Sequence, residues 1–214
     1  MAHGKVRHPV FARCYARIST ALEAQGADQH RRELLAGLHG TVIEVGAGNG
    51  LNFAHYPTSV THVLGVEPEP HLRRLAREAA PTASVPVDVV EGLAEDLPAA
   101  DGSCDAVVAS LVLCSVADPP AALAEMRRVL GADGELRFYE HVRARSRPLR
   151  RVQRLADATL WPRCAGGCHV GRDTPSAIEQ AGFVVDRLRR FRFPDGRVPA
   201  PASPHVIGRA HPHL

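Results

Sequence analysis

The stretch Thr41-Val-Ile-Glu-Val-Gly-Ala-Gly-Asn-Gly50 decides the fold. Its first half, 41–45, is a short run rich in β-branched residues, which is typical of a buried strand. Three glycines then follow at alternate positions. They let the backbone turn tightly and let a ligand lie close to the main chain. A strand that ends in such a loop favours an open α/β sheet, in which ligands bind at the carboxyl ends of the strands.

Outward from this loop, short apolar runs alternate with helical patterns. Besides 41–45, strands are expected in the segments 60–66, 85–90, 105–116, 135–142, 183–193 and 205–210. Helical spacing of apolar residues or an N-terminal proline predicts helices at 11–22, 51–56, 70–80, 119–130 and 175–180. The alternation predicts an α/β fold with a mostly parallel, doubly wound sheet of seven strands and helices on both faces. The last two strands have no helix between them, so we expect them to pair antiparallel at one edge.

Length and composition narrow the class of protein. A chain of 214 residues predicts a single domain, 1–214, and 45% hydrophobic with 23% charged residues excludes a disordered chain or a coiled coil. The net charge of +3 is too small to indicate a nucleic-acid-binding protein. Residues 1–9 contain no apolar signal segment, and no run approaches the ~20 apolar residues of a spanning helix, so we expect a cytoplasmic protein. The five cysteines are expected to be free thiols.

Two phosphate-binding motifs compete for the glycine loop, and both fail. The dinucleotide motif needs a third glycine where Leu51 stands, and a P-loop needs Gly-Lys-Ser/Thr where Gly50 is followed by Leu51 and Asn52. Instead, Glu44 precedes the first glycine and Glu67 ends the second strand, where a carboxylate can accept both hydroxyls of a ribose. Acidic residues without a nearby Lys or Arg suit a cationic ligand that has no phosphate. S-adenosylmethionine is such a ligand.

At this level of detail the sequence resembles the class I methyltransferases over essentially the whole chain. The segments similar to their motifs are 42–50 (VIEVGAGNG), 65–68 (GVEP), 91–108 (EGLAEDLPAADGSCDAVV) and 127–138 (RRVLGADGELRF). The last segment departs from the family pattern at 131–134, which should alter only the turn before the fifth strand. The resemblance implies a Rossmann-like methyltransferase domain, with S-adenosyl-L-methionine as cofactor and S-adenosyl-L-homocysteine as product.

Four further segments are more specific than the glycine loop. They resemble the small methyltransferase-like thiol S-methyltransferases, and next to them the ubiquinone/menaquinone C-methyltransferases, in 110–116 (SLVLCSV), 138–142 (FYEHV), 167–174 (GCHVGRDT) and 203–210 (SPHVIGRA). Animal members of that family begin with an apolar membrane-anchoring segment that this sequence lacks. A soluble version is therefore implied.

The resemblance also assigns residues to the cofactor. It places the ribose at Glu67, the adenine at the loop after the third strand, and the methionine part at the end of the fourth strand. The implied cofactor-binding residues are Glu44, Gly46, Ala47, Gly48, Asn49, Gly50, Asn52, Glu67, Pro68, Leu93, Ala94, Glu95, Ser110 and Leu111. A tight turn that binds nothing is the alternative for the glycines, and a solvated acidic loop is the alternative for 93–96.

Assignments on the acceptor side are less determined. The resemblance implies an N-terminal helical lid at 1–38 and an insertion at 143–172 that shapes the acceptor pocket. Tyr15, Leu113 and Trp161 are the candidate substrate-binding residues, with core packing as the alternative for Tyr15. His141 and His169 are the candidate general bases because strand ends ring the site, and a structural histidine is the alternative for His141.

The expected reaction moves a methyl group to a small, largely apolar molecule, and a thiol sulfur is the favoured acceptor. A thiol near pKa ~8.5 is partly ionised at neutral pH and needs no obligatory base. The alternatives are C-, N- or O-methylation of a secondary metabolite, a quinone or a lipid head group, and last an RNA methyltransferase. Asp118-Pro-Pro-Ala lacks the aromatic residue that stacks on an extruded base and follows the fourth strand too late, so no DNA partner is expected and an RNA partner is disfavoured.

Two remaining patterns are not assigned to the reaction. Cys164, Cys168 and His169 have a spacing that could begin a zinc site, but a further ligand pair is absent and methyl transfer needs no metal, so no metal is expected. The arginine-rich run 143–154 predicts a solvated helical face, with an anionic partner as the alternative. The sequence does not determine the oligomeric state.

Overall fold

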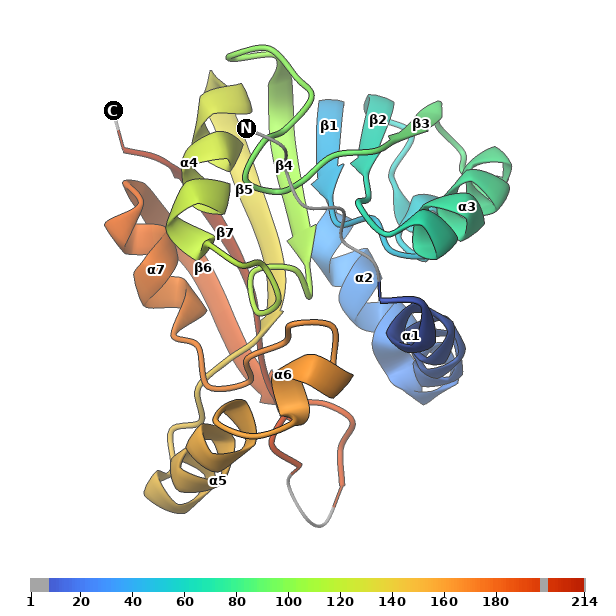
Figure 1. Cartoon of the computed structure of the whole chain (residues 1–214). Helices are drawn as coiled ribbons and strands as arrows, with labels where there is room; N and C mark the ends of the chain where they lie inside the picture. The colour runs from blue at the N-terminus through green and yellow to red at the C-terminus, as the bar shows by residue number, and fades with distance from the viewer. Residues whose placement is uncertain (1–7, 197–199, 214) are drawn as a thin grey trace.

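One mixed sheet of seven strands organises the part of the chain that the computed structural model describes, residues 8–196 and 200–213 (Figure 1). The strand order is β3-β2-β1-β4-β5-β7-β6. The strands are β1 (Gly40–Val45), β2 (Val60–Val66), β3 (Val87–Val90), β4 (Cys104–Ser110), β5 (Leu130–His141), β6 (Phe183–Arg192) and β7 (Pro204–Pro212). The first five run parallel, and β7 pairs antiparallel with both β5 and β6. The predicted doubly wound sheet with an antiparallel C-terminal pair is confirmed.

Helices cover both faces of this sheet. They are α1 (Pro9–Leu22), a π-helix (Glu23–Ala27), α2 (Asp28–Leu35), a 3₁₀ turn (Phe53–His55), α3 (Pro70–Ala79), a 3₁₀ turn (Ala80–Thr82), α4 (Pro119–Val129), α5 (Arg147–Asp157), α6 (Trp161–Cys164) and α7 (Thr174–Gln180). Helices α4 and α7 pack on one face, and α2 and α3 on the other (Figure 1). None of the described helices is long and apolar enough to cross a membrane.

Alternating side chains of the strands produce two core layers. In β1, Val42 belongs to the layer under α2 and α3, whereas Ile43 and Val45 belong to the layer under α4 and α7. A strand between two helical layers is buried on both faces, which explains the nearly continuous apolar run in the sequence. Because β1, β2 and β4 are parallel neighbours, their carboxyl ends meet at one edge of the sheet.

Helix starts follow local chemistry that the sequence shows. Proline occupies the first turn of α3 and α4, where its missing N–H removes no helical hydrogen bond. The residue before each helix caps it: the Glu69 carboxylate accepts from the Leu72 N–H, and the Asp118 carboxylate accepts from the Ala121 N–H.

Several strand boundaries differ from the prediction, and two of these differences have a local cause. β3 begins at Val87 instead of 85, because Pro86 has no N–H to donate to a neighbouring strand. β5 begins at Leu130 instead of 135. Leu130 pairs with Cys104 and Glu135 with Ala106, so the four residues 131–134 lie opposite Asp105 alone and bulge from the pairing.

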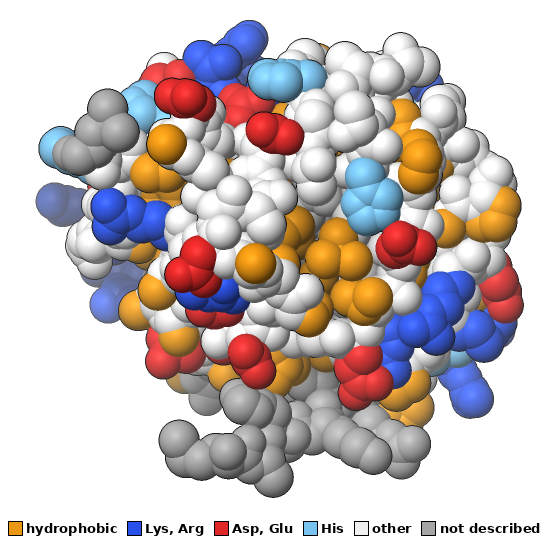
Figure 2. All heavy atoms as spheres, turned by 90° about the horizontal axis from the view of Figure 1, so that it is seen from above, with side chains coloured by type: hydrophobic (Ala, Val, Ile, Leu, Met, Phe, Trp, Pro, Cys, Tyr) orange, Lys and Arg blue, Asp and Glu red, His pale blue; other side chains and the backbone are white. Residues whose placement is uncertain are grey.

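Charged side chains of both signs lie around the rim of the face seen from above, with hydrophobic side chains gathered near its middle (Figure 2). The arginine-rich run 143–154 differs from this mixed surface, because its charges are all positive. Its residues 147–154 lie in α5 as predicted, whereas 143–146 precede the helix. Five of its side chains line one depression beside Gln153, and they are Arg143, Arg147, Arg150, Arg151 and Arg154.

Candidate active site

A cavity of about 640 Å³ lies at the carboxyl ends of β1, β2 and β4. This volume is in the range of cofactor and small-molecule sites. One end of the cavity is formed by the glycine loop, Glu67 and Tyr15 of α1, whose ring faces Gly48, and the other by the segment 166–172 after α6. Figure 1 shows α1 and α6 at this end of the sheet.

The glycine loop lines the cavity with main-chain atoms, because its glycines have no side chains. Gly46 and Gly48 line the cavity and have φ angles of +65° and +58°, which favour glycine. A Cβ atom on Gly46 would lie 2.5 Å from Cγ2 of Val112. A Cβ on Gly48 would point across the cavity toward the Tyr15 ring, 3.5 Å from its Cε1. The Gly46 N–H donates to the carbonyl oxygen of Val66 and so fixes the loop to the end of β2.

Glu67 is the buried carboxylate of the site. Its Oε2 accepts from the Gly48 N–H at 2.8 Å, and its Oε1 accepts from the Glu69 N–H at 2.9 Å. Burial raises its pKa to about 7, against the effect of these two hydrogen bonds. An ionised carboxylate offers about four acceptor positions, so Glu67 can still accept from a ligand's hydroxyl groups.

Some predicted cofactor residues support the loop without lining the cavity. Glu44 accepts from Asn52 Nδ2 at 2.8 Å and from the Tyr56 hydroxyl at 2.7 Å, while the Asn52 Oδ1 accepts from Arg31. None of these side chains lines the cavity, and their buried hydrogen bonds hold the glycine loop against α2. Asn49 likewise donates to the Ser19 hydroxyl of α1. The other two residues of this group are Ala47 and Gly50, which pack beside Phe53 and Gly65.

The remaining predicted cofactor residues do line the cavity. They are Pro68, Leu93, Ala94, Glu95, Ser110 and Leu111. Glu95 also accepts from the backbone N–H groups of Ala117 and Asp118. The Ser110 hydroxyl is buried and has no hydrogen-bond partner among the described residues, and Leu111 has a φ of +60°. A buried hydroxyl without a partner in a cavity wall is available to a ligand.

The predicted acceptor-side residues separate into two groups. Tyr15 and His169 line the cavity, and His169 Nδ1 lies 2.8 Å from the Gly167 carbonyl oxygen. Leu113, Trp161 and His141 do not line it. Leu113 packs in the core layer under α4, and Trp161 packs against a small cluster formed by Cys114, Cys168 and Val170.

Long-range contacts between three of the family-specific segments build a wall, and the sequence does not show which of their residues meet. Arg172 lines the cavity and donates to the Leu113 carbonyl oxygen at 2.6 Å. Glu140, fully buried on β5, accepts from the N–H groups of Val112, Leu113 and Cys114. Burial raises the pKa of Glu140 well above its usual value. These contacts join residues 26 to 59 positions apart, so no local motif marks them.

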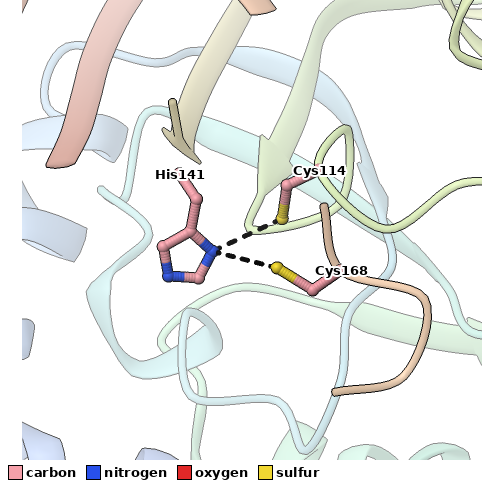
Figure 3. Close-up of side chains that lie close together, drawn as sticks. All are labelled: Cys114, His141 and Cys168. Carbon is pink, nitrogen blue, oxygen red and sulfur yellow. Dashed lines mark hydrogen bonds between the residues drawn. The ribbon is translucent and has the colours of Figure 1, made fainter. Parts of the chain in front are cut away.

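A second group of reactive side chains lies directly behind this wall. His141, the last residue of β5, has its Nδ1 at 3.5 Å from the sulfur of Cys114 and 3.6 Å from the sulfur of Cys168 (Figure 3). Cys114 follows β4 and Cys168 follows α6. The chain neighbours of these cysteines, Ser115 and Gly167, line the cavity.

Comparisons with known proteins agree with this geometry. Residues 43–138 match the family model described as a methyltransferase domain. The human thiol S-methyltransferase TMT1B is 32% identical over 86% of this chain and 78% of its own length. The mouse thiol S-methyltransferase TMT1B is 35% identical over 89% of this chain and 82% of its own length.

The chain belongs to the class I S-adenosylmethionine-dependent methyltransferases. Its sequence is similar to those of thiol S-methyltransferases. Solved structures show the same fold. A methyltransferase from Thermotoga maritima, titled a possible histamine N-methyltransferase, has a TM-score of 0.66 at 20% identity and covers 94% of this chain and 97% of its own. Geranyl diphosphate methyltransferase in complex with SAM has a TM-score of 0.67 at 15% identity, over 92% and 89% of the two chains.

The residues of this methyltransferase fit its cofactor, S-adenosylmethionine. Glu67 retains acceptor positions for hydroxyl groups, and the Ser110 hydroxyl is available for a polar contact. Gly46 and Gly48 keep clear the space that side chains would fill. The carboxylates of Glu67 and Glu95 also place negative charge in the cavity wall, which suits a cationic ligand.

Proposed function

We propose that this methyltransferase methylates the sulfur of a small, largely apolar thiol. The observation that carries the proposal is the lining of the cavity, in which Leu111, Val112 and Val116 form an apolar wall next to the residues that fit the cofactor. Two relatives with 32% and 35% sequence identity over most of the chain are thiol S-methyltransferases. The acceptor would lie against this wall, facing the segment 166–172.

In this proposal Glu67 accepts the ribose hydroxyls, and Gly46 and Gly48 let the cofactor approach the main chain. Leu93, Ala94 and Glu95 surround the adenine, with Pro68 beside it, and Ser110 and Leu111 contact the methionine part. A second group of residues does not touch the cofactor but holds the glycine loop in place through packing and hydrogen bonds. It consists of Glu44, Ala47, Asn49, Gly50 and Asn52. This division follows the cavity lining.

When bound, S-adenosylmethionine supplies a methyl group on a positively charged sulfur, which is already an activated leaving group. The chain therefore has to align the acceptor for in-line attack and exclude water from the cavity. Tyr15 would cover the cofactor from α1, as part of the lid at 8–38, and the insertion 143–172 would complete the acceptor pocket. The lid residues 1–7 lie outside the described part of the chain.

A thiol acceptor makes modest demands on these residues. With a pKa of about 8.5, a few per cent of a thiol is ionised near neutral pH, and the thiolate is a strong nucleophile. His169, which lines the cavity, is the residue placed to take a proton from a less acidic acceptor. His141 is separated from the cavity and is better placed to act on the two cysteines beside it.

The proposal is tested with a panel of small alkyl and aryl thiols, phenols, indoles and amines. Release of S-adenosylhomocysteine gives the rate, and mass spectrometry of the product gives the methylated atom. We expect turnover with apolar thiols and an S-methyl product. Turnover of a phenol or an indole while every thiol stays inert would reject the thiol acceptor and leave the methyltransferase assignment intact.

A further inference from the structure

Three elements that are distant in sequence bring two thiols and an imidazole to one point. Cys114 lies on the loop after β4, His141 ends β5, and Cys168 lies on the loop after α6 (Figure 3). The ligand atoms of all three residues lie within 4.8 Å of one another. No metal is expected from the sequence. Of Cys164, Cys168 and His169, whose spacing could begin a zinc site, only Cys168 belongs to the group that the structure assembles.

The distances match the edges of a tetrahedral zinc site. Zinc binds cysteine sulfur at about 2.3 Å and histidine nitrogen at about 2.0–2.1 Å, so tetrahedral angles place sulfur and nitrogen roughly 3.5–3.6 Å apart. The observed separations of His141 Nδ1 from the two sulfurs are 3.5 and 3.6 Å. The two nitrogen-to-sulfur separations therefore match those around a central ion, and the two sulfurs lie within 4.8 Å of one another.

Hydrogen bonding within the group does not use all three atoms. A neutral imidazole nitrogen has one lone pair, so Nδ1 of His141 can accept a proton from only one of the two thiols that converge on it. A cation at the centre would engage both sulfurs and the nitrogen together. Two thiolates and a neutral imidazole also carry the charge that balances one divalent ion, which matters because Cys114 and Cys168 are 1% and 6% exposed.

We propose that Cys114, His141 and Cys168 bind one zinc(II) ion. Binding releases the two thiol protons, while His141 coordinates through Nδ1 and keeps its proton on Nε2. Sulfur ligands with one imidazole suit zinc rather than the oxygen-binding magnesium or calcium. Water completes the fourth position. The ion fastens the segment 161–170, and with it Gly167 and His169 of the cavity wall, to the ends of β4 and β5.

The first experiment measures metal content. The full chain is purified without a histidine tag, under reducing conditions, dialysed, and analysed by inductively coupled plasma mass spectrometry. We expect about one zinc per chain, and loss of most of it in Cys114→Ser and Cys168→Ser. Cys104→Ser is the matched control, since Cys104 is also buried but lies away from the group, where its thiol donates to the Val129 carbonyl oxygen. Cys104→Ser should retain the metal.

The second experiment needs no variant and so does not depend on whether the serine variants fold. Alkylation of the native wild-type chain, mapped by peptide mass spectrometry, should leave Cys114 and Cys168 unmodified until a zinc chelator is added. Cobalt(II) loading of the same chain should give the visible absorption bands of a tetrahedral site and thiolate-to-metal charge-transfer bands.

Three results would overturn the proposal. The first is a wild-type chain without stoichiometric zinc that also fails to bind added zinc or cobalt. The second is zinc retained equally by Cys114→Ser and Cys168→Ser. The third is a Cys114–Cys168 disulfide in protein kept under reducing conditions, seen as a linked peptide two hydrogens lighter. None of these readouts involves methyl transfer, so they are independent of the proposed acceptor.

Discussion

The two ends of the cavity are built in different ways. At the cofactor end, Gly46, Gly48 and Glu67 lie within about 20 positions of one another and are joined by a backbone-to-carboxylate hydrogen bond. At the acceptor end, the wall depends on contacts such as Arg172 with Leu113 and Glu140 with Val112, which span 59 and 28 positions. The cofactor end is therefore a local motif, whereas the acceptor end exists only once the whole sheet has formed.

The largest effect is expected where the two ends touch. In Gly46→Ala, the new Cβ would lie 2.5 Å from Val112, at a φ of +65° that disfavours side chains. We expect the affinity for S-adenosylmethionine to fall by at least about 100-fold, roughly 3 kcal/mol, measured by isothermal titration calorimetry.

A matched control separates backbone strain from the clash with Val112. Gly37 has a similar φ of +77° with nothing within 4 Å of its would-be Cβ, so Gly37→Ala should leave cofactor affinity unchanged. Adding Val112→Ala to Gly46→Ala should recover part of the lost affinity. An unaltered dissociation constant in Gly46→Ala would show that the glycine loop does not contact the cofactor.

The next effect concerns the acceptor end alone. Glu140→Gln replaces one carboxylate oxygen by an NH₂ group, which cannot accept from the backbone N–H groups that converge on it. We expect the free energy of unfolding to fall by about 2 to 3 kcal/mol in urea denaturation, the range for leaving buried hydrogen-bonding groups unpaired. Glu179→Gln, on the exposed end of α7, is the control.

The Glu140→Gln variant also tests whether the two ends of the cavity act separately, because its losses of turnover and of cofactor affinity can be compared. Turnover should fall more than cofactor affinity, because the loop 112–114 belongs to the acceptor end and Glu67 is far along the chain. A loss of cofactor affinity as large as the loss of turnover would show that the two ends are not separable.

A smaller effect is expected at the cofactor end from Glu67→Gln. The amide keeps one acceptor oxygen and loses the charge, so S-adenosylmethionine should bind about 5- to 30-fold more weakly at pH 8, or about 1 to 2 kcal/mol. Because the pKa of Glu67 in the free protein is raised to about 7, the wild type should lose affinity as the pH falls below 7.

The pH profile distinguishes a ligand contact from a structural role. Hydroxyl donors favour the ionised carboxylate, so wild-type affinity should reach a plateau above pH 7, while the Glu67→Gln profile should lack this step. Titration calorimetry between pH 5.5 and 8.5, corrected for buffer protonation, checks it. A step that persists in Glu67→Gln would assign the titration to another group.

The same contrast explains how much the sequence could predict. The mostly parallel sheet of seven strands, the antiparallel C-terminal pair and the site at the carboxyl ends of the strands follow from periodicity, prolines and the glycine loop, whereas the order of the strands comes from the structure. Of the predicted cofactor residues, those such as Glu67 and Gly48 that face the cavity have neighbours in the motif that point them there. Glu44 also belongs to the motif, but its carboxylate is satisfied by Asn52 and Tyr56, which sequence spacing alone does not pair with it.

Sequence reasoning is weakest where side chains meet across different elements. Cys114, His141 and Cys168 are separated by 27 positions at each step, and each stands alone in its own segment. Their proximity depends on β4 and β5 being neighbours and on the return of the chain after α6. Only the three-dimensional fold supplies that information, and the same holds for Arg172 beside Leu113.

The smallest effect is expected at Tyr15, the residue of α1 that faces the glycine loop. Its ring lies 3.5 Å from the position that a Cβ on Gly48 would take, and Phe11 packs against it with ring centroids 5.6 Å apart. If the ring covers the cofactor, its apolar surface matters more than its hydroxyl group. Tyr15→Phe should therefore change the dissociation constant of S-adenosylmethionine by less than about threefold, or about 0.6 kcal/mol. Tyr15→Ala should weaken binding by about tenfold, because burial of an aromatic ring contributes about 1.5 to 3 kcal/mol and water replaces part of the contact. Val10→Ala, on the same helix but 82% exposed, should have no effect. Equal affinities for Tyr15→Ala and wild type, measured by titration calorimetry, would show that α1 does not act as a lid over the cofactor.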